Sequence, residues 1–204
     1  MIPPNGLSEW LCRTDGSTDL PTAIAWESLT PESWLAGLSK HCSALLAERD
    51  KGILCISGKA GSGKSTLGRL LRKQGMPGIA PGELLVIDDS MLHLKWFGIF
   101  PRRIKHRTQE RDYLAPFASF FSGRRLLVYV NTHPEKRIER CDILLRLRCP
   151  EEQREARLLA RDPDGAARFA STREASDNPR ILAERYLDLP SDQVDFRQGM
   201  GRAT

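Results

Sequence analysis

The clearest chemical signal in the sequence is the run from Gly58 to Ser65, which reads GKAGSGKS. It matches the pattern G-x-x-x-x-G-K-[ST], in which glycines let backbone N–H groups turn toward phosphate oxygens with no Cβ in the way. Lys64 would reach the β- and γ-phosphates, and the hydroxyl of Ser65 would complete the coordination of Mg²⁺. We therefore expect a nucleoside triphosphate and Mg²⁺ to bind here. The predicted nucleotide-binding residues are Gly58, Gly61, Ser62, Gly63, Lys64, Ser65 and Thr66.

Acids and arginines further along the chain are the other candidates for chemistry. Asp88 and Asp89 follow directly after an apolar run, and one interpretation is that they cap the next helix. The arginines lie downstream in a charged segment, and some would be solvated partners of glutamates three or four positions away. They are Arg154, Arg157 and Arg161 at helical spacing, followed by Arg168 and Arg173 in what reads as a polar loop.

These residues need a scaffold, and the apolar pattern around them predicts one. Residues 53–57, directly before the loop, have the composition of a strand buried on both faces, and a helix is predicted from residue 64 to about residue 74. Further strands are predicted at residues 84–87, 126–130 and 143–147, and a charged helix from residue 151 to about residue 161. This alternation implies an α/β fold, with a parallel sheet and helices on both of its faces.

The loop, together with an acid at the end of the next strand, resembles the P-loop kinases, including polynucleotide-kinase-like and zeta-toxin-like enzymes. The resemblance implies a P-loop NTPase three-layer sandwich and ATP as the phosphate donor. It also implies that Asp88 or Asp89 faces the acceptor hydroxyl and acts as general base or orients it. The arginine that often follows the acid pair in this family is absent, because Ser90 and Met91 stand there.

Residues 141–161 look like the part of nucleoside and nucleotide kinases in which a strand leads through a proline into an arginine-rich helix and a mobile lid. In that family, arginines of the lid close over the phosphates and neutralise the charge that develops during transfer. The resemblance therefore implies that residues 151–175 form a lid. It further implies that Arg157 and Arg161 act in catalysis and that Arg168 contacts the nucleotide.

The segment from residue 90 to residue 123 is expected to be a helical insertion that binds the acceptor. It mixes aromatic residues such as Trp96 and Phe100 with the basic run PRRIKHR at residues 101–107. Aromatics among arginines suit stacking on bases and holding a phosphodiester backbone, whereas the alternative is an aromatic core with a solvated basic face. The expected acceptor is a hydroxyl of a nucleoside, nucleotide or nucleic acid. Resemblance to phage-type kinases adds 5-hydroxymethyluracil in DNA as a specific candidate.

Other functions stay open on the sequence. The acceptor could be a small metabolite or a sugar nucleotide, or the chain could be a regulatory ATPase in which Asp88 holds magnesium and water is the acceptor. A GTPase is disfavoured because no N-K-x-D motif occurs, and a transporter ATPase because no L-S-G-G-Q signature occurs. The strand at residues 126–130 ends in Asn131, so the usual magnesium acid is missing there, and the nearby His133 suits a capping or surface role.

Length and composition predict one soluble domain over residues 1–204, with a helical N-terminal extension at residues 1–50. Hydrophobic residues make up 40% of the 204, and the net charge of +5 is a mild basic excess that helps polyphosphate or nucleic acid bind. No run approaches the ~20 apolar residues of a membrane helix. The five cysteines are scattered and are expected to be reduced, which favours a cytoplasmic protein without a membrane partner. The sequence does not indicate the oligomeric state.

Overall fold

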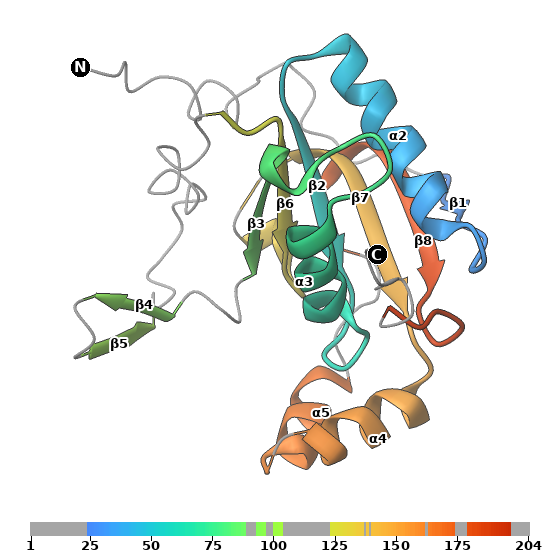
Figure 1. The fold of residues 1–204 in the computed structure, drawn as a ribbon. Coiled ribbons are helices and arrows are strands. Elements are labelled where there is room, and N and C mark those ends of the chain that lie inside the picture. The colour runs from blue at the N-terminus through green and yellow to red at the C-terminus, as the bar shows by residue number, and fades with distance from the viewer. Residues whose placement is uncertain are drawn as a thin grey trace, which may run out of the picture.

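The computed structural model describes residues 24–88, 93–96, 100–103, 123–136, 138, 140–161, 163–173 and 179–196. Within them, six parallel strands form one sheet in the order β1-β8-β7-β2-β6-β3 (Figure 1). Along the chain these strands are β1 (Glu27–Ser28), β2 (Gly52–Ser57), β3 (Leu84–Asp88), β6 (Leu126–Val130), β7 (Arg140–Arg148) and β8 (Leu182–Pro190). The protein is therefore an α/β fold built on an all-parallel sheet.

Two helices, α2 (Trp34–Glu48) and α3 (Lys64–Gln74), pack on one face of the sheet and lie in front of it in Figure 1. Buried residues such as Leu38, Cys42 and Leu45 recur every three or four positions in α2, so they form one apolar stripe. They share a hydrophobic cluster with Leu67 and Leu71 of α3. Burying each such leucine stabilises the fold by about 1.5–3 kcal/mol, and the packing fixes where α3 begins.

The opposite face of the sheet carries a second cluster, which includes Cys55, Tyr129 and Leu144 from three neighbouring strands. Near the amino-terminal ends of the strands, the side chain of Asp142 in β7 contacts the start of β2 and the residue that follows α2. Its Oδ2 accepts a hydrogen bond from the backbone N–H of Ile53 at 2.6 Å, and its Oδ1 accepts one from Nη1 of Arg49 at 2.7 Å. This carboxylate therefore ties the start of β2, and the chain that leaves α2, to β7.

The connections between strands diverge at β2. Helix α3 leads from β2 to β3 on one side, whereas α4 (Glu151–Arg161) and α5 (Gly165–Arg173) lead from β7 to β8 on the other side. Open parallel sheets bind ligands in the crevice at the carboxyl ends of their strands, at the position where two neighbouring strands have connections that run to opposite sides. The glycine-rich loop leaves β2 there, and α4 and α5 lie at the same end of the molecule (Figure 1).

The central elements agree with the sequence predictions. The helices at residues 64–74 and 151–161 and the strand at 126–130 match α3, α4 and β6 at both ends, and the other predicted strands are confirmed with small boundary shifts. Strands β1 and β8 were not predicted. The sequence of β8 (LAERYLDLP) places charged residues between apolar ones, and its exposed Glu184 and Arg185 hide the pattern of a buried strand.

Two local predictions were wrong. The insertion is not helical at the residues described, because β4 (His93–Trp96) and β5 (Phe100–Arg103) pair as an antiparallel two-stranded sheet. Polar and apolar residues alternate from His93 to Trp96, which is the period of a strand. The segment after α4, expected to be a polar loop, contains α5, and its alanines favour a helix. Asp89 and the rest of residues 90–122 lie outside the described residues.

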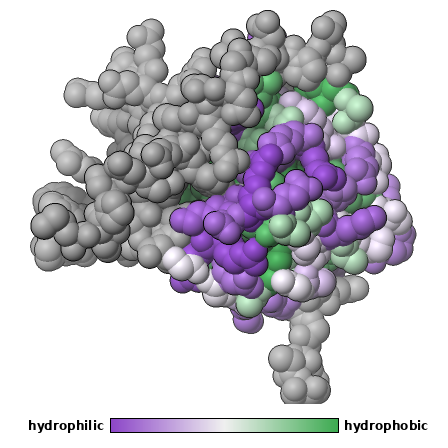
Figure 2. Space-filling view, turned by 90° about the horizontal axis from the view of Figure 1, so that it is seen from above, coloured by the Kyte–Doolittle hydropathy of each residue, from purple (hydrophilic) through white to green (hydrophobic). Residues whose placement is uncertain are grey.

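The face of the described residues that lies opposite α4 and α5 is mostly hydrophilic (Figure 2). Seen from the end opposite α4 and α5, purple residues predominate and are broken by small green areas (Figure 2). Leu159 is the one large hydrophobic side chain that stands exposed among the described residues, at 54%. None of the described helices is both long and apolar enough to cross a membrane. Four cysteines in this part of the chain are free thiols, and burial raises the pKa of Cys42 to about 12.

Candidate active site

The glycine-rich loop has the backbone conformation that its glycines permit. Gly61 and Gly63 have positive φ angles of 83° and 97°, a region that other residues rarely adopt. A Cβ at Gly61 would lie 2.9 Å from the carbonyl oxygen of Arg154, and one at Gly63 would lie 2.8 Å from Cε2 of Phe196. The glycines are therefore required both for the turn and for the close approach of neighbouring segments.

Lys64 begins α3 and is almost fully buried, at 8% exposure. Its Nζ donates a hydrogen bond to the carbonyl oxygen of Lys59 at 2.8 Å, so the amine points back across the loop. Burial lowers the pKa of Lys64 to about 7, from 10.5; nearby Asp88 opposes this shift, and Arg154 and Arg161 add to it. The negative charge near the protonated amine of Lys64 is therefore too small to stabilise it fully. An anion bound in the loop would supply more negative charge.

A cavity of about 180 Å³ lies over the loop, at the carboxyl ends of the strands. It brings together most of the predicted site residues: Asp88 at the end of β3, Arg161 from α4, Arg168 from α5 and several loop residues. The residues that line it are Ala60, Gly61, Gly63, Lys64, Ser65, Thr66, Asp88, Val130, Asn131, Thr132, Arg161 and Arg168. Three cationic side chains and one buried carboxylate therefore meet at one site.

Some predicted site residues stand apart from this cavity. Gly58 and Ser62 belong to the loop but lie beneath its surface, and the fully buried hydroxyl of Ser62 has no hydrogen-bond partner among the described residues. Arg157 is not among the lining residues; its Nη1 lies 3.5 Å from the carbonyl oxygen of Gly61 and from Sγ of Cys149. Asp89 lies outside the described residues, so its role stays a prediction.

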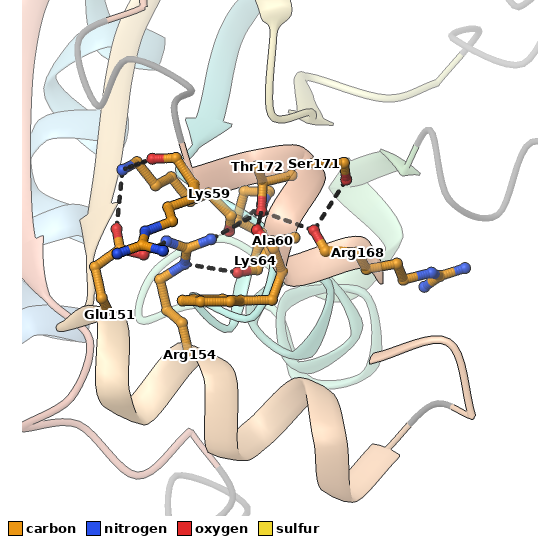
Figure 3. Close-up of polar contacts among 10 residues, drawn as sticks. Lys59, Ala60, Lys64, Glu151, Arg154, Arg168, Ser171 and Thr172 are labelled. Atoms are coloured by element: carbon orange, nitrogen blue, oxygen red, sulfur yellow. Dashed lines mark hydrogen bonds and ion pairs between the residues drawn. The ribbon is translucent and has the colours of Figure 1, made fainter. Parts of the chain in front are cut away.

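The structure adds one arginine that sequence reasoning left without a role. Arg154 is 1% exposed, and its guanidinium contacts the loop and residues of both α4 and α5. Its Nε donates to the carbonyl oxygen of Ala60 at 2.8 Å, and its Nη2 donates to Oγ1 of Thr172 at 2.8 Å (Figure 3). The helical spacing of the arginines identified Arg154 as one of a set, but its contacts with the loop and with α5 separate it from Arg157 and Arg161.

Asn131 occupies the cavity wall at the end of β6, between the loop and β3. Its side-chain amide is fixed on both sides. Nδ2 donates to the hydroxyl of the buried Tyr129 at 2.6 Å, and Oδ1 accepts from the backbone N–H of His133 at 2.9 Å. A neutral amide in a fixed orientation therefore lines the cavity at the end of β6.

The residues present fit ATP and Mg²⁺. The glycine turn gives the loop the positive φ angles with which backbone N–H groups can face a phosphate, and Lys64, Arg161 and Arg168 supply positive charge around the cavity. No group of three or more acidic, histidine or cysteine side chains that could hold a metal occurs among the described residues. Mg²⁺ suits a site with few protein ligands, because it binds proteins through one or two oxygens and keeps several of its water molecules. Ser65 and Asp88 both line the cavity and supply such oxygens.

Comparison with known proteins gives two similar solved structures. One is a gluconokinase from Sinorhizobium meliloti 1021, with 18% identity and a TM-score of 0.40, covering 74% of this chain and 91% of its own. The other is a sugar kinase from Janibacter sp. HTCC2649, with 17% identity and a TM-score of 0.40, covering 75% of this chain and 92% of its own. No family model matches the chain, and no curated protein sequence matches it.

Proposed function

We propose that the protein is an ATP-dependent kinase that transfers the γ-phosphoryl group to a hydroxyl. The observation that carries this proposal is a single cavity in which a phosphate-binding loop, a buried carboxylate and two arginines from the segment after β7 converge. A site that only binds a nucleotide needs the loop and its lysine. Transfer also needs charge neutralisation at the γ-phosphate and a group that orients the nucleophile, and this cavity supplies both.

Five of the residues that line the cavity have proposed roles that follow from their positions. Lys64 would contact the β- and γ-phosphates. Phosphate oxygens would replace the carbonyl oxygen of Lys59 as the acceptor for Nζ of Lys64, and their negative charge would keep the amine protonated. Arg161 and Arg168 line the same cavity from α4 and α5 and would contact the same phosphates. Mg²⁺, held through the hydroxyl of Ser65, would supply electrostatic stabilisation of the transferred phosphoryl group. Asp88 or Asp89 accepts the proton of the acceptor hydroxyl or orients it.

For the acceptor, we propose a hydroxyl of a nucleoside, nucleotide or nucleic acid, with 5-hydroxymethyluracil in DNA as a specific candidate. The observation in favour is the β4–β5 ribbon, in which His93 pairs with Arg103 and Leu94 with Arg102. Two-stranded ribbons that carry cationic and aromatic residues suit contact with nucleic acid. A small metabolite, a sugar nucleotide, or water in a regulatory ATPase are the alternatives.

ADP release from ATP separates these functions. A kinase releases ADP rapidly only with its acceptor, whereas an ATPase needs none. Radiolabelled ATP is offered with nucleosides, oligonucleotides, small sugars, and DNA that carries 5-hydroxymethyl pyrimidines, and the labelled product identifies the acceptor. We expect Lys64→Ala to abolish transfer and Lys73→Ala, at an exposed position of the same helix, to retain it. Equal ADP release with and without every acceptor would contradict the kinase proposal.

DNA binding tests the acceptor class independently of turnover. If the β4–β5 ribbon binds DNA, the association constant falls as the salt concentration rises. In a plot of the logarithm of the association constant against the logarithm of the salt concentration, each phosphate contact adds about 0.9 to the magnitude of the slope on duplex DNA. A variant with Arg102, Arg103 and Lys105 all changed to Ser should flatten that slope and leave the affinity for ATP nearly unchanged. Label on free nucleosides or sugars alone, without salt-sensitive DNA binding, would remove the nucleic-acid proposal.

A further inference from the structure

Helices α4 and α5 are packed so closely that they form one unit. At Gly165, where α5 begins, an added Cβ would lie 2.4 Å from the carbonyl oxygen of Leu158 in α4, so the two backbones touch at this glycine. Arg161 and Arg168, which line the cavity, belong to this pair of helices. Their position over the phosphate site therefore depends on how the α4–α5 unit is held against the loop.

A buried guanidinium holds it. Arg154 donates from three different nitrogens to three segments: Nε to the carbonyl oxygen of Ala60 in the loop, Nη1 to Oε2 of Glu151 at 2.5 Å in α4, and Nη2 to Oγ1 of Thr172 in α5. The same guanidinium carbon lies 5.4 Å from the ring centroid of Phe169 in α5. Only arginine offers this planar set of donors, so no other residue type could satisfy all three acceptors.

A second tie runs beside the first. The Nζ of Lys59 donates to Oε1 of Glu151 at 2.9 Å and to the carbonyl oxygen of Arg173, the last residue of α5, at 3.1 Å (Figure 3). The backbone carbonyl of Lys59 is also the acceptor for Nζ of Lys64. Two consecutive loop residues, Lys59 and Ala60, therefore contact the α4–α5 unit, and one of them also holds the predicted phosphate-binding lysine.

We propose that Arg154 is a positioning residue for phosphoryl transfer, which couples the α4–α5 unit to the glycine-rich loop and so places Arg161 and Arg168 over the phosphates. This inference rests on the proposed kinase function. Arg154 itself acts through other residues, because each of its three guanidinium nitrogens donates a hydrogen bond within the protein and it does not line the cavity. A misplacement of about 1 Å at such a site can lower the rate about 100-fold.

The test measures whether Arg161 depends on Arg154. Arg154→Met keeps the apolar length and removes the donors; we expect kcat to fall by about 30- to 100-fold, with KM for ATP changing less. Arg161→Ala should cost a similar factor in the parental protein but only about twofold or less in the Arg154→Met background, because its guanidinium is already misplaced. Arg72→Met, at an exposed position of α3, is the matched control and should leave kcat unchanged. Losses that multiply in the double variant, or a kcat within about threefold of the parent, would overturn the proposal.

A milder variant and a measurement without turnover complete the experiment. Thr172→Val removes only the hydroxyl and keeps the shape, so it folds even if Arg154→Met does not. We expect amide hydrogen exchange in Thr172→Val to accelerate in residues 58–63 as well as in 165–173, with the sheet unchanged. Faster exchange in α5 alone would overturn the coupling. If the parental protein transfers no phosphoryl group to any acceptor but this joint exchange is seen, the kinase proposal fails and the coupling stands.

Discussion

Raising the pH above neutrality is expected to weaken nucleotide binding through Lys64. In the protein without nucleotide, burial lowers the pKa of Lys64 to about 7, and the negative charge of Asp88 offsets only part of this shift. Phosphate oxygens beside the amine favour its charged form, so nucleotide binding raises the pKa. Between the two pKa values the free protein holds a neutral amine and the complex a charged one. Binding therefore takes up a proton in that range.

The size of the effect follows from this linkage. With one proton taken up, the affinity falls by up to tenfold for each pH unit above the pKa of the free protein. Relative to the plateau at low pH, the loss at about pH 8.5 is up to about 30-fold, or roughly 2 kcal/mol. Below about pH 7 Lys64 is charged in both states, so its contribution levels off. The terminal phosphate of the nucleotide has its second pKa near about 6 and contributes little at alkaline pH.

Calorimetric titration with MgADP at about pH 8, in two buffers of different ionisation enthalpy, counts the protons. We expect the parental protein to take up about one proton per nucleotide and Lys64→Met to take up none. Lys73→Met, which changes an exposed lysine of the same helix, should behave as the parent. Binding heats that are independent of the buffer in the parental protein, or unchanged proton uptake in Lys64→Met, would refute the reasoning.

Three further variants test the site and its support. Asp88→Asn keeps the shape of the side chain and should lower kcat by about 10²- to 10⁴-fold while ATP still binds, as steady-state kinetics and calorimetry would show; small losses would favour a capping role. Gly63→Ala should weaken ATP binding strongly in a titration, because Gly63 has a positive φ and the added Cβ would collide with the ring of Phe196. Gly82→Ala is the control and should not weaken binding, because the added Cβ would have no atom within 4 Å beyond the neighbouring residues in the chain. Asp142→Ala leaves Arg49 without this partner and should lower the free energy of unfolding in urea by about 2–4 kcal/mol. Asp142→Asn, which keeps an acceptor oxygen, should recover part of that loss.

The loop and the elements around it could be predicted because each carries its own local signal. Buried parallel strands show as uninterrupted apolar runs, which is why β2 and β6 were recognised. The glycines of the loop have a fixed spacing, and α3 has leucines on one face and a glycine at its end. These signals reside in neighbouring residues, so they are present in the sequence before any packing is known.

The remaining features depend on contacts between distant residues. Nothing local separates the buried Arg154 from Arg157, because the difference is made by Thr172 of α5 and Ala60 of the loop. In the same way, β8 lies between β7 and β1 although its sequence carries exposed charges. Tertiary packing overrides the local pattern at such positions.

The pairing of β1 with β8 has a consequence for synthesis of the chain. The first of the described strands finds its partner in the last, and Phe196, which follows β8, packs against both Trp34 of α2 and the backbone at Gly63. On the ribosome, α2 and the glycine-rich loop therefore emerge long before the residues that hold them in place. The proposed phosphate site is completed only once residues 182–196 have left the exit tunnel, so an mRNA truncated before that point would yield a chain with an intact motif and an unfinished site.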